Sequence, residues 1–143
     1  MKRIRFGILG SGYMGRTHAE AVRRLPQAQL IAIHGGTRAP ALAERYGVAF
    51  VPEKAALLAR NDIDALVVTT PHHLHVDETL AALAQGKHVL VEKPLATSVA
   101  ACERMIAAAA AAGRTLAVGY QQRFRLNNVR ACELIRSGAI GRV

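Results

Sequence analysis

Short apolar runs alternate with longer segments of helical character along the 143-residue chain. Apolar runs predict strands at residues 4–9, 30–34, 48–51, 65–69, 88–91 and 116–119, of which 48–51 is the weakest. The segments between and after them predict helices at residues 14–24, 40–46, 53–60, 76–85, 99–112 and 129–136. Glycine stands just past four of these helices, where a left-handed residue commonly ends a helix: Gly47, Gly86, Gly113 and Gly138.

This alternation predicts an α/β fold. The main predicted strands are almost continuously apolar, which indicates a sheet that is buried on both faces. Strand–helix–strand connections place neighbouring strands parallel and cover both faces of the sheet with helices. A chain of this length holds one ordinary domain and has no room for a second full one. We therefore expect a single domain built on one doubly wound parallel sheet.

A glycine-rich turn follows the first predicted strand. Residues 6–15 read FGILGSGYMG, so the apolar run breaks into Gly10, Gly12 and Gly15. In a G-x-G-x-x-G turn the first glycine permits the tight turn, the second lets the backbone approach a pyrophosphate, and the third lets the helix pack close to the strand. The phosphates would meet the free N–H groups of a helix that begins near Met14. The pattern predicts a Rossmann domain that binds a dinucleotide; a tight turn without a ligand is the simpler alternative.

Composition limits the possible partners. The formal net charge of +9 would suit a nucleic-acid-binding protein, but Lys and Arg are spread along the chain and only three Phe and three Tyr offer aromatic faces. A surface that attracts a phosphate-rich cofactor explains the charge as well, so we expect no nucleic acid. Cys102 and Cys132 lack metal or disulfide spacing, and no apolar run suits a signal peptide or a membrane span. We expect a cytoplasmic protein without a membrane segment.

Polar residues gather where the predicted strands end, which is the edge at which parallel sheets bind ligands. TTPHHLH follows Val68, EKP follows Val91 and YQQRF follows Gly119. The histidine run has no companion ligand set besides Asp77, so we expect no metal site. We interpret Arg123 as a cation near the substrate or cofactor edge, although it could equally hold the loop of Phe124 in place.

Four motifs together resemble the amino-terminal half of the Gfo/Idh/MocA oxidoreductases, the glucose-fructose oxidoreductase and inositol dehydrogenase family: the glycine turn, TPHHLH, GKHVLVEKP, and YQQRF followed by SGAIG. The resemblance covers the whole chain. It implies a Rossmann domain for NAD or NADP over residues 1–125, with residues 126–143 as a connecting helix and the start of a missing substrate domain. The full-length protein would bind a sugar or polyol, and we expect it to be a homo-oligomer. The implied cofactor contacts are Gly10, Gly12, Tyr13, Met14, Gly15, Thr70, Pro71, His75, Glu92 and Lys93, together with His72, which stands where the family commonly has Asn.

Lys93 is the predicted catalytic residue. Removing a hydride from a secondary alcohol requires that the hydroxyl proton leave as well, and a lysine amine beside the nicotinamide is a suitable base or relay. Glu92 and Lys93 are adjacent at a strand end and should point to opposite sides, so we expect no ion pair between them. The alternative interpretation is that both simply form the solvated exit of a buried strand.

The end of the second predicted strand bears on the choice of cofactor. NAD-specific Rossmann domains usually place an acidic residue there, whose carboxylate binds the ribose 2'-hydroxyl. Here the strand is followed by Gly35, Gly36, Thr37 and Arg38. Thr37 can donate a hydrogen bond and Arg38 offers a fork suited to a 2'-phosphate. We therefore expect NAD or NADP to bind, with NADP preferred. The main alternative to an oxidoreductase is a non-catalytic dinucleotide-binding sensor or interaction module.

Overall fold

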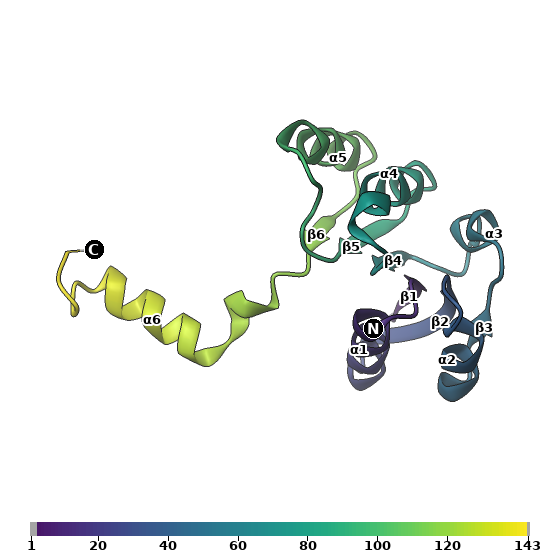
Figure 1. Cartoon of the computed structure of the whole chain (residues 1–143), viewed down its shortest axis with the longest axis horizontal. Coiled ribbons are helices and arrows are strands. Elements are labelled where there is room, and N and C mark those ends of the chain that lie inside the picture. The colour runs from purple at the N-terminus through teal and green to yellow at the C-terminus, as the bar shows by residue number, and fades with distance from the viewer. Residues whose placement is uncertain (1–2, 143) are drawn as a thin grey trace.

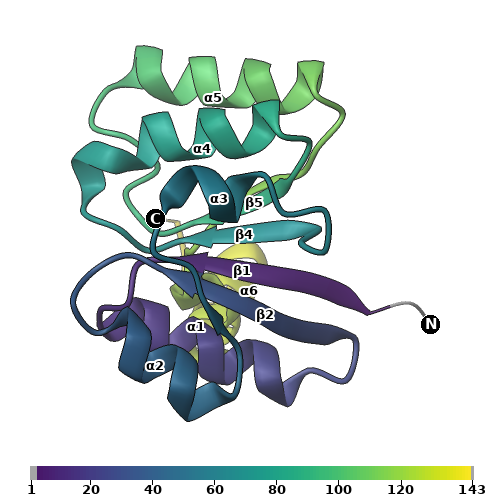
Figure 2. The same cartoon turned by 90° about the vertical axis from the view of Figure 1, so that its right-hand side faces the viewer.

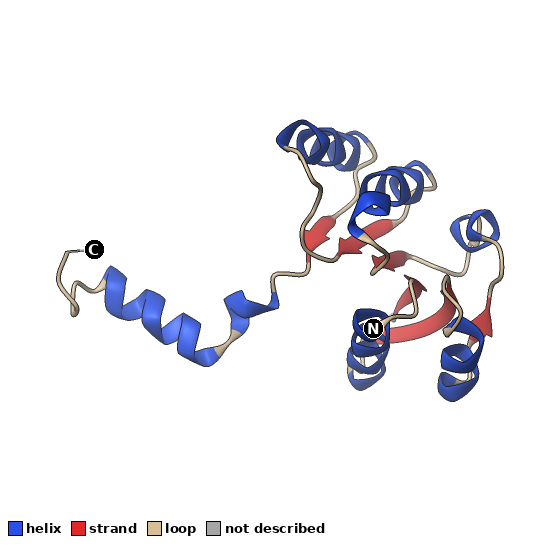
Figure 3. Cartoon of the chain, viewed as in Figure 1, coloured by secondary structure: helices blue, strands red, loops and turns tan. Residues whose placement is uncertain are grey.

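The computed structural model describes residues 3–142, and every strand and helix predicted from the pattern is present (Figure 3). The strands are β1 (Ile4–Leu9), β2 (Ala28–His34), β3 (Ala49–Phe50), β4 (Ala65–Val68), β5 (His88–Val91) and β6 (Leu116–Val118). The helices are α1 (Tyr13–Arg24), α2 (Ala39–Tyr46), α3 (Lys54–Leu58), α4 (His75–Ala84), α5 (Val99–Ala111) and α6 (Leu126–Arg136), with short 3-10 turns η1 (His72–Leu74) and η2 (Gln121–Phe124) that the pattern did not predict. The four glycines predicted to end helices have φ between 60° and 72°, which confirms that assignment.

The strands form one parallel sheet in the order β3-β2-β1-β4-β5-β6. The chain winds outward from β1 to β3, returns to the middle, and then winds outward again from β4 to β6. This is the doubly wound order of a Rossmann domain, and its direction reverses between β1 and β4. The predicted fold class is therefore confirmed.

Helices cover both faces of the sheet (Figure 2). The helices α3, α4 and α5 lie on one face, and α1 and α2 lie on the other. Successive residues of a strand alternate between the two layers: Ile8 and Val67 pack with the α1 and α2 side, whereas Leu9 and Leu66 pack with the opposite side. These four side chains are at most 1% exposed. Burial of each stabilises the fold by about 1.5–3 kcal/mol, so the apolar runs of the central strands account for both cores.

The carboxyl-terminal segment leaves this body. After β6 the chain passes through η2 into α6, which extends away from the sheet (Figure 1). None of the residues of α6 is buried, and Phe124 and Leu126 are 81% and 86% exposed. Within residues 3–142 no helix has both the length and the apolar character that crossing a membrane would require.

Candidate functional site

A cleft of about 730 Å³ opens at the carboxyl ends of the central strands. Backbone hydrogen bonds hold its loops together, since the Gly10 N–H donates to the His34 carbonyl and the Thr69 N–H donates to the Leu9 carbonyl, each at 2.8 Å. The cleft therefore lies where the winding of the sheet reverses, the usual ligand position in such sheets. It is lined by Gly10, Ser11, Gly12, Tyr13, Met14, His34, Gly35, Gly36, Thr37, Arg38, Lys54, Thr69, Thr70, Pro71, Leu74 and Glu78.

The three glycines of the turn have different surroundings. A Cβ atom on Gly10, which has φ of +103°, would lie 2.8 Å from the Thr69 backbone, and one on Gly15 would lie 2.1 Å from the Gly10 carbonyl oxygen. Neighbouring backbone atoms leave no room for a side chain at either position. Gly15 can therefore contact a ligand only through its backbone N–H. A Cβ on Gly12 would meet no atom within 4 Å. The open space at Gly12 lies where the backbone is expected to approach a pyrophosphate.

The amino terminus of α1 faces this open space. Gly12 is the N-cap residue of α1 and no side chain caps the helix. The first N–H groups of a helix have no partner within the helix, and here they belong to Tyr13, Met14 and Gly15. Together with the positive end of the helix dipole they form a site for anionic oxygens.

The loop after β4 forms the opposite wall of the cleft. The Thr69 hydroxyl donates to the Leu9 carbonyl at 2.9 Å and so fixes this loop to the end of β1. The Thr70 hydroxyl donates to Glu78 of α4 at 2.5 Å, and the Lys54 ammonium of α3 lies 3.4 Å from the same carboxylate. Glu78 is 3% exposed, so these contacts partner its buried carboxylate.

Sequence reasoning missed several residues that line the cleft. Ser11 lies inside the glycine turn and Thr69 directly at a strand end. Both places were already predicted to border the ligand, so these two residues could have been predicted from the sequence. Glu78 and Lys54 lie on helices away from the strand ends, and no local pattern pointed to them. The other lining residues without a prediction are His34, Gly35, Gly36 and Leu74.

The structure does not place His75 in the cleft. Its side chain is fully buried, with the ring Nε2 2.9 Å from the Thr70 carbonyl oxygen and Nδ1 2.9 Å from the Pro94 carbonyl oxygen. Both ring nitrogens face protein atoms, so this geometry does not support the contact of its side chain with the cofactor that the resemblance implied. His72 is exposed on η1, with its ring edge-on to that of His75, and it too lies outside the residues that line the cleft.

Glu92 and Lys93 follow β5 at the same sheet edge. The Glu92 carboxylate is 5% exposed, and its Oε1 atom lies 2.8 Å from Nε2 of His18 on α1. Its Oε2 atom accepts the Lys93 backbone N–H at 3.2 Å. Glu92 is thus turned toward α1, whereas the Lys93 side chain is exposed and the Lys93–Pro94 peptide bond is cis. Both carboxylate oxygens of Glu92 thus contact protein groups, and the implied contact of Glu92 with the cofactor stays a prediction.

Arg123 lies on η2, where the chain has already left the sheet. It lines a separate groove of about 530 Å³ beside α6, together with residues such as Asn128, Val129 and Cys132. The structure therefore does not bring Arg123 to the dinucleotide cleft. Among residues 3–142 there is also no group of three or more His, Cys, Asp or Glu side chains that could hold a metal ion.

Comparison with known proteins agrees with this geometry. Residues 4–120 match the profile of an oxidoreductase family described as having an NAD-binding Rossmann fold. The chain belongs to this family, the Gfo/Idh/MocA oxidoreductases. The family match spans β1 to β6 and includes the glycine turn, the loop after β4, and Glu92 and Lys93.

Relatives within the family include sugar and polyol enzymes. Inositol 2-dehydrogenase 3 of Saccharopolyspora erythraea is 34% identical over 96% of this chain. The dTDP-3,4-didehydro-2,6-dideoxy-alpha-D-glucose 3-reductase of Streptomyces antibioticus is 37% identical over 97%. The crystal structure of scyllo-inositol dehydrogenase from Lactobacillus casei with bound NAD(H) and scyllo-inositol matches with a TM-score of 0.89 and 28% identity over 98% of this chain. The chain spans 42% to 43% of the length of these three proteins.

Proposed function

We propose that this chain is the dinucleotide-binding part of an oxidoreductase that transfers a hydride between a nicotinamide cofactor and a carbinol carbon of a sugar, polyol or related alcohol. The observation that carries the proposal is the position of Lys93, exposed after β5 at the sheet edge where the cleft opens after β1, β2 and β4. The inositol and deoxysugar substrates in the names of the relatives support an alcohol of this class.

The cleft has the features that a dinucleotide needs. The open space at Gly12 and the free N–H groups of Tyr13 and Met14 suit a pyrophosphate. The loops that carry Thr37 and Pro71 enclose the cleft from its two sides and would hold the adenosine half. When bound, the nicotinamide ring supplies the hydride acceptor or donor.

In the proposed reaction, the protein supplies a group that accepts and returns the proton of the alcohol. Oxidation of a carbinol releases a hydride from the C–H bond and a proton from the hydroxyl group. We assign that proton to Nζ of Lys93, which takes it up during oxidation and returns it during reduction. Glu92 is a poor alternative because its carboxylate is buried and bound to His18.

We further propose that NADP(H) is preferred over NAD(H). The loop after β2 presents Thr37 and Arg38 to the cleft and carries no carboxylate that would repel a 2'-phosphate. Glu78 is the acidic residue in the cleft lining, and its carboxylate is already partnered by Thr70 and Lys54.

We also propose residues 1–125 as the cofactor domain and residues 126–143 as the connection to a substrate-binding domain. The exposed, projecting α6 supports this division (Figure 1). For the whole protein we propose a homo-oligomer in the cytoplasm, with Cys102 and Cys132 as free thiols.

Calorimetric titration of the 143-residue chain with NADH and NADPH tests the binding. A folded chain that binds neither cofactor would overturn the proposal. Lys93→Met should leave both dissociation constants within about threefold, because the amine serves the alcohol. In a protein that joins this domain to a substrate-binding domain, the same change should lower kcat by about 10²–10⁴-fold. Unchanged kcat would remove Lys93 from the reaction.

A further inference from the structure

A second pocket of about 350 Å³ adjoins the dinucleotide cleft between α1 and α2. Four of its lining residues also line the cleft, so the two cavities share a boundary formed by the glycine turn and the loop after β2. Three of its eight lining residues are arginines and none is acidic. We call it the arginine pocket; its lining comprises Ser11, Gly12, Tyr13, Arg16, Arg38, Ala41, Leu42 and Arg45.

We propose that the arginine pocket binds the 2'-phosphate of NADP(H), with Ser11 at its base and Arg16 and Arg45 joining Arg38 around the anion. The proposal rests on the proposed function, because it needs the adenosine half of a dinucleotide in the neighbouring cleft. It adds three residues to the recognition of the phosphate beyond the loop after β2.

Ser11 is a largely buried residue whose hydroxyl group borders both cavities without a hydrogen bond to the residues that the structure describes. Its residue is 6% exposed and lines both cavities. Among residues 3–142 no hydrogen bond of its side chain is found. A Cβ atom on Gly36 would lie 2.8 Å from the Ser11 Oγ atom, so this hydroxyl lies where the glycine turn meets the loop after β2. A hydroxyl group that lines a cavity without a protein partner can donate to a ligand, and a phosphate oxygen in the pocket would accept from it.

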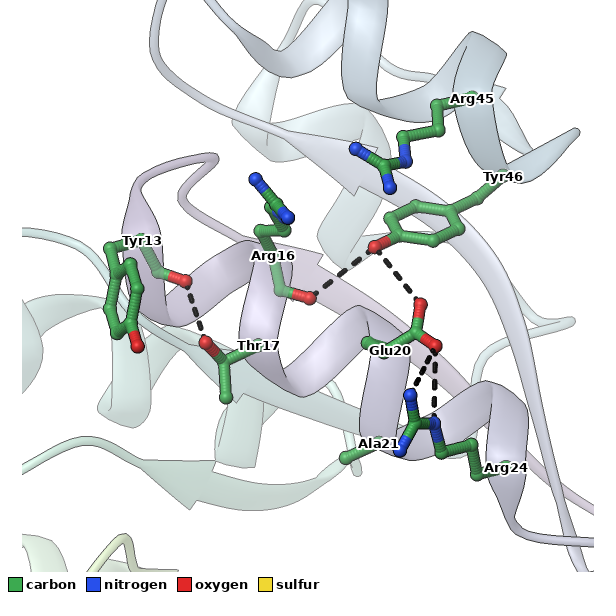
Figure 4. A pocket seen from close by; sticks show the side chains of 8 residues that line it. All are labelled: Tyr13, Arg16, Thr17, Glu20, Ala21, Arg24, Arg45 and Tyr46. Carbon is green, nitrogen blue, oxygen red and sulfur yellow. Dashed lines mark hydrogen bonds and ion pairs between the residues drawn. The ribbon is translucent and has the colours of Figure 1, made fainter.

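The arginines come from two helices that face each other across a groove. Arg16 lies in the first turn of α1 and Arg45 in the last turn of α2. Figure 4 shows both side chains in the adjoining groove of about 630 Å³, with Arg45 beside the ring of Tyr46. The Tyr46 hydroxyl oxygen lies 3.5 Å from both the Arg16 carbonyl oxygen and the Glu20 carboxylate, and the Arg45 guanidinium carbon lies 5.8 Å from the ring centroid. Tyr46 therefore connects the two segments that carry the arginines.

These arginines have no acidic partner in the described part of the chain. The ion pairs found there include Arg24 with Glu20 at 3.1 Å, but none involves Arg16, Arg38 or Arg45. Glu20 lines the adjoining groove with Arg16 and Arg45, but it is paired with Arg24, so the positive charges around the arginine pocket still repel one another. A phosphate dianion would remove that repulsion, and the guanidinium fork matches the spacing of phosphate oxygens.

The position of the pocket selects which phosphate it would take. The pyrophosphate belongs at the amino terminus of α1 inside the cleft. The arginine pocket lies on the side of Thr37 and Arg38, where a Rossmann domain places the ribose hydroxyls of the adenosine half. A phosphate on the 2'-oxygen is therefore the one that can extend into it.

Two adenosine fragments isolate this contact. Adenosine 2',5'-bisphosphate carries the 2'-phosphate, and 5'-AMP lacks it. We expect the parent chain to bind the bisphosphate at least tenfold more tightly at fixed ionic strength. Arg16→Ala and Arg45→Ala should each weaken the bisphosphate and NADPH about five- to tenfold and leave NADH within twofold. Ser11→Ala should weaken the same two ligands by a smaller factor.

Arg24→Ala is the matched control. It removes the same charge from the same helix as Arg16→Ala, but Arg24 lines the adjoining groove of about 630 Å³ and not the arginine pocket, and it is paired with Glu20. Equal losses for NADH and NADPH in the Arg16 and Arg45 variants, or an equal loss in Arg24→Ala, would show a general effect of charge and overturn the pocket assignment. A parent that binds NADH and NADPH equally also overturns it and leaves the proposed function standing, whereas a parent that binds neither refutes the proposed function itself.

Discussion

His75 and Pro94 are joined by a contact of 2.9 Å between the ring Nδ1 atom and the carbonyl oxygen. The second ring nitrogen lies 2.9 Å from the Thr70 carbonyl oxygen. Carbonyl oxygens only accept, so a neutral ring satisfies one of these contacts and a protonated ring satisfies both. The buried ring thereby ties the loop that lines the cleft to the segment that carries Lys93. His75 is a positioning residue in this arrangement.

His75→Leu should destabilise the fold by about 2–4 kcal/mol, because it removes the buried ring that contacts the carbonyl oxygens of Thr70 and Pro94 and donates to at least one of them. It should also weaken NADPH, since Thr70 lies in the cleft wall. Urea unfolding followed by circular dichroism measures the first effect, and calorimetry measures the second. His73→Leu, at an exposed position in the same loop, is the control. Equal stability of the two variants would show that the His75 contacts contribute nothing.

The glycine turn gives a pair of contrasting variants. Gly12→Asp should fold normally, because a side chain at Gly12 meets open space, yet it should weaken NADH and NADPH at least tenfold by placing bulk and negative charge at the pyrophosphate. Gly15→Ala should disrupt folding, because its Cβ would lie 2.1 Å from the Gly10 carbonyl oxygen. Thermal unfolding and calorimetry separate the two results. Parent affinity in folded Gly12→Asp would contradict the placement of the pyrophosphate.

The buried position of Lys87 predicts that the free energy of unfolding depends on pH. Its buried ammonium donates to the carbonyls of Arg60 at 2.7 Å and Ile63 at 3.0 Å, and burial lowers the pKa of Lys87 below its ordinary value of 10.5. Between the folded pKa and that of the unfolded chain, the unfolded state binds more protons. The contribution of this group to stability therefore rises with pH up to about 10.5 and is lost as the pH falls through the folded pKa.

Lys87→Met isolates this effect. The variant should lose about 1–3 kcal/mol at neutral pH, because two carbonyl groups lose their donor. The difference in free energy of unfolding between parent and variant should then grow as the pH approaches 10.5. Urea unfolding at a series of pH values measures it, and a constant difference would show that this amine does not titrate differently in the two states.

The exposed apolar residues near α6 should cause self-association of the isolated chain. Phe124 and Leu126 are nearly fully exposed and lie at the end of η2 and the start of α6. Sedimentation velocity over a range of concentrations should show larger species, and the double variant Phe124→Ser with Leu126→Ser should reduce them while dinucleotide binding stays unchanged. A parent chain that is monomeric at every concentration would contradict this prediction.

An assay of catalytic turnover by the 143-residue chain tests the proposed domain boundary at residue 125. The purified 143-residue chain should not oxidise scyllo-inositol, myo-inositol or glucose with either cofactor, since it lacks the surface that we propose positions the alcohol, and positioning supplies much of the rate. Robust turnover would assign a substrate site to residues 1–143 and refute the proposed connecting role of 126–143.

The local pattern was enough for the fold. Nearly continuous apolar runs such as Ala65–Val68 predict buried strands, and Gly47 and Gly86 mark helix ends because few other residues adopt positive φ at low energy. The spacing of Gly10, Gly12 and Gly15 likewise located the turn of the cleft. These features depend on backbone conformation and periodicity, which a sequence carries within a few residues.

The sequence by itself thus determined the elements, the sheet class and the edge at which the chemistry gathers. Only the tertiary structure decided which side chains meet there. In that structure His75 is buried, Glu92 contacts His18 of α1, and Arg123 lies after the last strand in a groove separate from the cleft. It also brought Arg16 and Arg45 to the lining of one pocket with Arg38. The physical reason is that the direction of a side chain beyond a strand end depends on packing between helices and loops that are distant in the chain, and no local period encodes that packing.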